Sequence, residues 1–176
     1  MSMTLDKNGL HVAGTTCVNG AGFLVHANNT AVVGSGGYGT TRHNVVQSVS
    51  YGNTTSRIHI KTSMRHTSNG THPNLSEMYR VHIHGYGYGS SLPIDTVCVG
   101  YVYSGGNTLS SHQVSTRPNC ATVTQYMSSD GYLTFTVYTS AYYTTVNLDW
   151  ERAGGNGTLR DSSSILSVTY NNSDTI

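Results

Sequence analysis

Charged residues and helix-forming residues are both scarce in this sequence. Only 10% of its 176 residues are charged, against about a quarter in an average soluble domain. The good helix formers Ala, Leu, Glu and Lys are few, whereas Thr, Val and Tyr, which suit strands, are common. These deficits predict an all-β protein with almost no helix.

Long apolar runs and basic runs are also missing. No stretch approaches the roughly 18 apolar residues of a membrane-spanning helix. The net charge is only +1, and no run of Lys or Arg is interleaved with aromatic residues. The opening residues, MSMTLDKNGL, lack the apolar core of a signal peptide. We therefore expect no nucleic-acid binding, no membrane insertion and no classical secretion.

Cysteine is too rare to provide a covalent framework. Cys17, Cys98 and Cys120 are odd in number and widely spaced, so they form neither a disulfide pattern nor a paired-cysteine metal motif. We expect reduced thiols that serve as small core residues.

The sequence is rich in residues that form strands and turns. Thr, Ser, Gly, Asn and Tyr together contribute 93 residues (24, 22, 20, 14 and 13). About eight alternating segments follow one another, separated by turn residues such as Asp130-Gly131. They are residues 57–62, 78–88, 94–103, 108–114, 120–127, 132–139, 143–151 and 165–170. This spacing predicts an antiparallel, jelly-roll-like two-sheet β-sandwich over residues 51–176.

The first 50 residues differ from the remainder. Their short alternating pieces are broken by Asn8-Gly9, by Asn19-Gly20 and by GSGGYG at 34–39. We interpret residues 1–50 as an extended N-terminal β arm. Such an arm buries little surface alone and is stabilised when three copies wrap together, or when it clamps another protein.

Two predicted strands carry histidines between basic residues. His82 and His84 share the face of Arg80, and His59 lies between Arg57 and Lys61. If the two strands were neighbours, the three imidazoles would converge in an arrangement suited to zinc. However, the basic residues would repel a cation, and neither strand contains a carboxylate. We therefore expect no metal and no cofactor within one chain, although copies of His82 or His84 around a threefold axis could still hold an ion.

Other catalytic patterns are weak. Gly85, Gly87 and Gly89 resemble a dinucleotide-binding fingerprint, but no helix follows them, so close packing at a sheet bend is the preferred interpretation. Asp149 and Glu151 lie about 7 Å apart on one strand face, within the range of glycosidase carboxylates, but a solvated face beside Arg152 is favoured. No Gly-x-Ser-x-Gly motif is present. We assign no catalytic residue and expect no enzyme, with a metal- or carboxylate-dependent hydrolase as the third alternative.

The thirteen tyrosines form sequence clusters at 86/88, 101/103 and 142/143. Tyrosine presents a flat apolar ring and a hydroxyl with few rotatable bonds, which suits binding surfaces. These clusters predict either stacking against sugars, a subunit interface, or simple filling of sheet faces. No individual receptor-binding residue is identified.

Residues 78–95, MYRVHIHGYGYGSSLPID, continue into TVCVGYVYSGG and are followed later by GYLTFTVYTSAYYTTVNLDW. This succession resembles the C-terminal domains of bacteriophage tail-fibre and other virion structural proteins, and TLDKNGLHVAGTT resembles the repeats that join fibre shafts to heads. The resemblance covers about 100 residues of the chain. It implies a nonenzymatic, homotrimeric component of the outer virion surface, joined to other virion proteins through the arm.

Two virion functions follow from this resemblance. The first is a tail-fibre or spike domain that attaches to a host receptor such as a cell-surface glycan. Tail fibres usually carry a long shaft, for which this chain leaves little room. The alternative is therefore a decoration or cement protein that stabilises the capsid.

Overall fold

The computed structural model describes two parts of the chain. Within residues 1–38 it describes the backbone of five short strands. It also describes residues 39–50, 57–65, 77–89, 91–103, 108–139, 143–153 and 159–176, with side chains from residue 39 except at 49 and 50. Among these residues the only helix is a 3-10 turn, η1 (Ser162–Ser164), and no helix is long and apolar enough to cross a membrane.

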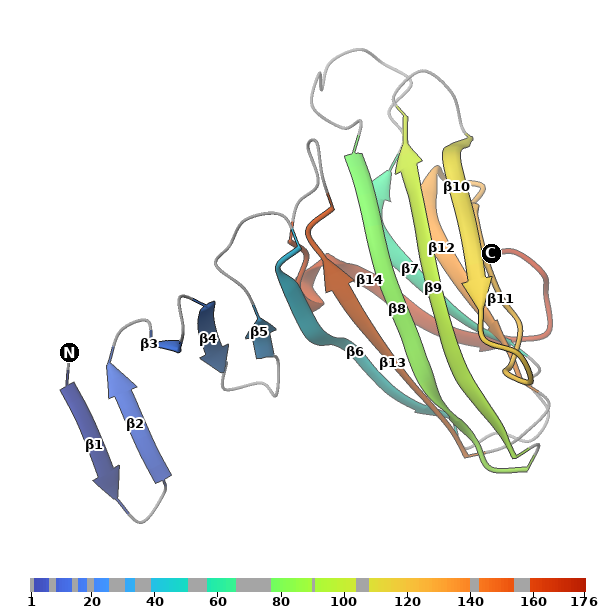
Figure 1. Cartoon of the computed structure of the whole chain (residues 1–176). Helices are drawn as coiled ribbons and strands as arrows, with labels where there is room; N and C mark the ends of the chain where they lie inside the picture. The colour runs from blue at the N-terminus through green and yellow to red at the C-terminus, as the bar shows by residue number, and fades with distance from the viewer. Residues whose placement is uncertain are drawn as a thin grey trace.

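Nine antiparallel strands form a two-layer sandwich (Figure 1). One layer has the order β10-β9-β8-β13-β6, and the other has the order β11-β12-β7-β14. Their bounds are β6 (Thr41–Ser50), β7 (Arg57–Arg65), β8 (Glu77–Gly87), β9 (Leu92–Val102), β10 (Leu109–Thr116), β11 (Val123–Met127), β12 (Tyr132–Tyr138), β13 (Thr144–Glu151) and β14 (Ile165–Asn171). The predicted all-β sandwich is confirmed.

The connections resemble those of a jelly roll in part. The chain passes from β6 in the first layer to β7 in the second and back to β8, and later from β12 to β13 and on to β14. By contrast, β8, β9 and β10 follow one another as neighbours within one layer. The sandwich therefore combines crossings between the layers with a three-stranded meander.

Five shorter strands precede the sandwich. β1 (Ser2–Asp6) and β2 (Gly9–Ala13) pair only with each other, whereas β3 (Thr16–Val18), β4 (Ala21–Val25) and β5 (Ala31–Val33) continue the first layer beyond β6. Figure 1 shows these blue strands extending to one side of the sandwich. The structure places residues 41–50, which the sequence assigned to the arm, inside the sandwich, because β6 pairs along β13.

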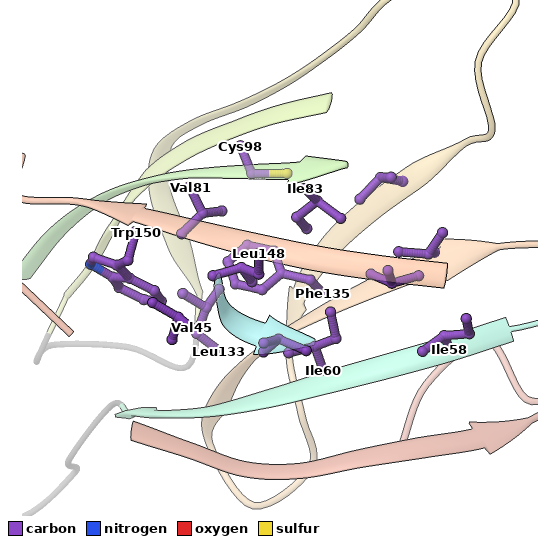
Figure 2. Packing of buried hydrophobic residues seen from close by; sticks show 14 of the residues in the cluster. Val45, Ile58, Ile60, Val81, Ile83, Cys98, Leu133, Phe135, Leu148 and Trp150 are labelled. Carbon is purple, nitrogen blue, oxygen red and sulfur yellow. The ribbon is translucent and has the colours of Figure 1, made fainter. Parts of the chain in front are cut away.

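The core fills the space between the two layers (Figure 2). It is supplied by alternate residues of facing strands, as period-two patterning requires. On β12, Leu133, Phe135 and Val137 are fully buried as predicted, and on β13 so is Trp150. Burial raises the pKa of the Cys98 thiol to about 12, so this cysteine remains a protonated core residue.

Two glycines confirm specific sequence signals. The β11–β12 hairpin turns at Asp130-Gly131, where Gly131 adopts a φ of +82° and donates to the Ser128 carbonyl. On β8, a side chain at Gly85 would place its Cβ 1.9 Å from the Thr145 carbonyl oxygen. The predicted close backbone packing is thus present at Gly85, and a turn rather than a helix follows β8.

Candidate functional site

A strip of polar side chains crosses the outer face of the first layer. Its members come from β6, β13, β8, β9 and the segment after β10, and they are His43, Asp149, His84, His82, Asp95 and Arg117. The antiparallel register sets Asp149 opposite His82 on one side of β8 and Asp95 opposite His84 on the other. Strand pairing therefore brings together groups that are far apart in the sequence.

Asp149 is at the centre of the strip. Its Oδ1 accepts a hydrogen bond from the Asn44 backbone N–H at 2.8 Å, its Oδ2 lies 2.8 Å from His43 Nδ1, and His84 Nε2 lies 3.4 Å from the same Oδ2. Its side chain is only 9% exposed. Burial raises the pKa of Asp149, but the contacts from His84, Asn44 and His43 outweigh burial and lower the pKa well below its ordinary value.

A β-bulge on β6 creates this environment. Leu148 pairs with Val46 and Trp150 with Arg42, so residues 43–45 lie opposite Asp149 alone. Asn44 adopts a φ of +56°, a left-handed conformation that Asn tolerates better than most residues. Bulges of this kind redirect side chains and are common beside functional sites. Here the bulge aims one backbone N–H and one imidazole at the same carboxylate.

The other end of the strip is held by Asp95. His82 Nε2 lies 2.8 Å from Asp95 Oδ1, and Arg117 donates to Asp95 Oδ2 at 3.2 Å. The hydrogen bond from His82 is the main cause of the lowered pKa of Asp95, with Arg117 contributing. The His82 and His84 rings stack with their centroids 5.0 Å apart. The contact of His84 Nε2 with the Asp149 carboxylate is the largest influence on the pKa of the His84 imidazole and raises it.

The condition under which His59 would converge with His82 and His84 is not met, because β7 and β8 are not neighbours. β7 lies between β12 and β14 in the second layer, and β8 lies between β9 and β13 in the first. His59 therefore points outward from the opposite side of the sandwich. The strands follow each other in sequence, but the chain crosses between the layers from one to the next.

His59 is fully buried rather than exposed on a polar face. Its Nε2 lies 2.9 Å from Asn171 Oδ1 and 3.1 Å from the Ser173 carbonyl, and its Nδ1 lies 3.0 Å from Thr136 Oγ1 and 3.2 Å from the Tyr126 hydroxyl. Because both partners of Nε2 are acceptors, Nε2 carries the proton. Burial is the main influence on the pKa of His59 and lowers it, although Asn171 and Ser173 oppose the shift.

The segment after β14 covers this histidine. It runs back toward β11 (Figure 1), where the Ile176 N–H donates to the Tyr126 hydroxyl at 3.0 Å. Arg57 holds the same segment by donating to the Asn172 carbonyl and to Asp174, each at 2.6 Å. His59 is thus a structural anchor for residues 171–176.

The carboxylate pair predicted on β13 is not a solvated pair. Asp149 is covered by the bulge, and Glu151 forms an ion pair with Arg80 on β8. Strand pairing explains the difference, because Glu151 lies directly opposite Arg80 in the register. A shallow depression of about 320 Å³ lies over this region, lined by Thr41, His43, Arg80, His82, Val97, Asp149 and Glu151.

Within the described residues, one group has the donor set and spacing to hold a metal ion. His82, His84 and Asp149 each offer one ligand atom, and these atoms lie within 4.8 Å of one another. Sequence reasoning missed His43 and Asp95 as members of the surrounding strip. The only local signal for the bulge is the polar run Arg42-His43-Asn44, which interrupts the alternation of β6.

A second candidate surface lies at the end of the sandwich that carries the β8–β9 turn. Tyr86, Tyr88 and Tyr143 are 47%, 57% and 49% exposed, and the rings of Tyr88 and Tyr143 meet edge to face at 6.1 Å. We call these three residues the tyrosine end. Tyr142, predicted as a neighbour, lies outside the described residues. Tyr101 and Tyr103 form a separate pair, 6.0 Å apart, toward the opposite end of β9.

Tyr143 has an unusual backbone conformation. Its φ is +54°, which is uncommon for a bulky side chain. Such conformations persist only where the surrounding structure enforces them, and they cluster at ligand-binding positions. The adjoining β13 begins at Thr144, which pairs with Gly87, so this strained residue is fixed beside the β8–β9 turn.

No protein-family model, no curated protein and no solved structure matches this chain. Functional interpretation therefore depends on the geometry of the two surfaces described above.

Proposed function

We propose that this protein is a virion attachment module that binds a glycan through its tyrosine end. The observation that carries the proposal is the exposure of Tyr86, Tyr88 and Tyr143 together at one end of a rigid sandwich. Exposed aromatic rings stack against the apolar C–H faces of sugars, and their hydroxyls bond to sugar hydroxyls. The resemblance of the sequence to tail-fibre domains supports the same function.

The arrangement of the chain is compatible with this proposal. The strands β1–β5 extend from the β6 side of the sandwich, whereas the tyrosine end is formed by the β8–β9 turn and the start of β13. An arm that joins a trimer or another virion protein would therefore leave the tyrosines available to a receptor. Binding loops supported by a rigid sheet are a common way to present contact residues.

A glycan array with the intact chain tests the binding function. We expect the double variant Tyr88→Ala/Tyr143→Ala to bind its best glycan at least about tenfold more weakly, equivalent to about 1.4 kcal/mol. Tyr103→Ala is the matched control, because Tyr103 has the same 49% exposure as Tyr143 but lies outside the tyrosine end. Equal binding by the double variant and the control would refute the glycan proposal.

Capsid decoration is the second candidate, favoured by the way β3–β5 add strands to the edge of the first layer. An arm that extends a sheet in this way can also pair with a neighbouring subunit. Quantitative mass spectrometry of purified particles separates the two functions. A copy number comparable to the capsid subunit supports decoration, whereas a far lower number supports a fibre or spike.

The proposed trimer has its own test. Light scattering coupled to size-exclusion chromatography should give three times the chain mass of 18.9 kDa. A monomer at every concentration would contradict trimerisation without deciding the glycan proposal.

A further inference from the structure

The histidine–carboxylate strip contains a group with metal-ligand geometry. His82 and His84 are two residues apart on β8, so both project from the outer face, and Asp149 lies opposite His82 on β13. The imidazoles of His82 and His84 are accessible, 38% and 34% exposed, and the Asp149 side chain beside them is 9% exposed. An ion could therefore reach the group from solvent without any rearrangement of the sandwich.

The spacing of two of these atoms matches coordination better than hydrogen bonding. Two ligand atoms each about 2.0–2.1 Å from a tetrahedral ion lie about 3.3 Å apart. The separation of His84 Nε2 and Asp149 Oδ2 is 3.4 Å. A charge-assisted N–H···O bond is typically shorter, about 2.7–2.9 Å. The gap between this imidazole and this carboxylate is thus suited to a shared ion.

The surrounding residues orient the proposed ligands. Metal-binding histidines usually donate their second ring N–H to a carboxylate, which fixes the tautomer. Asp95 occupies this position for His82 at 2.8 Å and is itself held by Arg117. With Nε2 protonated, Nδ1 is the nitrogen of His82 that offers a lone pair. On the other side, Asn44 and His43 fix the Asp149 carboxylate.

The charge distribution also permits a cation. Arg57 and Lys61, which the sequence placed beside the histidines, lie in the second layer, where they pair with Asp174 and Asp130. Arg80 remains in the first layer but is paired with Glu151. The electrostatic objection to a metal is therefore removed by the tertiary structure.

We propose that His82, His84 and Asp149 bind one Zn²⁺ ion within a single chain, with water completing its coordination. Two imidazoles and one carboxylate suit zinc, whereas Mg²⁺ and Ca²⁺ prefer sites made entirely of oxygen ligands. The ion ties β8 to β13 on the face opposite the core. This site is separate from the tyrosine end and does not depend on the glycan proposal.

Isothermal titration of the intact chain, purified without a histidine tag, tests the site with ZnCl₂. We expect one Zn²⁺ per chain and no comparable binding of Mg²⁺. His84→Gln should weaken Zn²⁺ binding by about 100-fold or more, and Asp95→Asn, which removes only an orienting partner, by about 10-fold. His112→Gln is the control, because His112 is exposed on β10, and its Nδ1 lies 3.1 Å from the Leu109 carbonyl oxygen rather than in the strip.

A second measurement keeps the test valid if a variant folds poorly. In NMR spectra of the unaltered protein, Zn²⁺ should shift the imidazole resonances of His82 and His84 and leave those of His59 and His112 unchanged. The proposal is overturned if these resonances do not move, or if His84→Gln and His112→Gln bind Zn²⁺ alike. A stoichiometry of one ion per three chains would also overturn it, since that ratio places the metal on a threefold axis.

Discussion

Two strands of this protein carry almost the same short pattern and present it to opposite environments. RIHIK on β7 and RVHIH on β8 both alternate basic or imidazole side chains with inward-facing aliphatic residues. On β8, His82 lies on an accessible face among charged partners. On β7, His59 is sealed beneath residues 171–176 and makes four polar contacts.

The difference shows that a polar strand face need not be a solvated one. Both outer faces satisfy the same period-two pattern, yet within the described part of the chain a returning segment covers only the face that carries His59. Where it is covered, the imidazole is neutral and structural. On the exposed outer face of the first layer, imidazoles and carboxylates lie close together, and a ligand could replace the contacts between them.

The largest expected effect is a difference in the free energy of unfolding between variants of His59 and His82. His59→Ala should lower the free energy of unfolding by about 2–4 kcal/mol, because it leaves a cavity and several buried partners unsatisfied. His82→Ala should cost less than about 1 kcal/mol, because its side chain is partly exposed. Urea denaturation of the two variants measures both values. Similar losses would mean that the two faces are not distinct.

A substitution at Gly85 should disturb the outer face of the first layer and leave the surroundings of His59 unchanged. Gly85→Ala forces a Cβ against the Thr145 carbonyl, so β8 and β13 must move apart at a cost of about 1–3 kcal/mol. Because His84 and Asp149 lie on these two strands, we expect Zn²⁺ affinity to fall as well. The NMR signals of His59 should stay in place. A shift confined to His59 would contradict this independence of the two faces.

Acid should destabilise the covered face. The pKa of His59 is lowered in the folded protein, so the unfolded chain takes up this proton first as the pH falls below about 6.5. Stability should therefore decrease with falling pH, by at most about 1.4 kcal/mol per pH unit from this residue. The raised pKa of His84 has the opposite effect.

The difference between the unaltered protein and His59→Gln isolates this contribution, because His84 is common to both. Chemical denaturation between pH 7 and pH 5, in steps of about half a unit, gives the two curves. We expect the curves to converge as the pH falls. Parallel curves would show that His59 does not control the acid response.

The smallest expected effect concerns residues 171–176, which cover His59. Tyr126→Phe removes the hydroxyl that contacts His59 and accepts the Ile176 N–H. The loss should be about 0.5–1.5 kcal/mol, the usual contribution of one hydrogen bond. Hydrogen exchange should become faster at the Ile176 amide. Tyr138→Phe is the control, because its hydroxyl donates to the exposed Asp174 carboxylate at 3.5 Å.

Local sequence patterns predicted the strands well, because in a half-buried strand the polarity of each side chain indicates which face of the sheet it occupies. All eight predicted segments of the sandwich are strands, and Leu133, Phe135 and Val137 face the core as expected. The ninth strand, β6, was missed. Its run Arg42-His43-Asn44 breaks the alternation, and the reason is a bulge that exists only opposite Asp149.

The candidate metal group was only half visible in the sequence. His82 and His84 were identified as a ligand pair, but their carboxylate partner comes from β13, more than sixty positions later in the chain by its numbering. Arg57 and Lys61 would lie beside His82 and His84 only if β7 and β8 were neighbours, and they are not. Nothing in either segment indicates that the chain changes layers between them.

The amino-acid sequence by itself determined that this chain forms antiparallel strands, where most of them lie, and which side chains fill the core. These properties follow from the side-chain period of a strand and from turn residues, which are local. Only the tertiary structure decided that His59 is sealed and that His82 and His84 meet Asp149. Strand order and register join segments distant in sequence, and the free energy that selects them belongs to the packed sandwich as a whole.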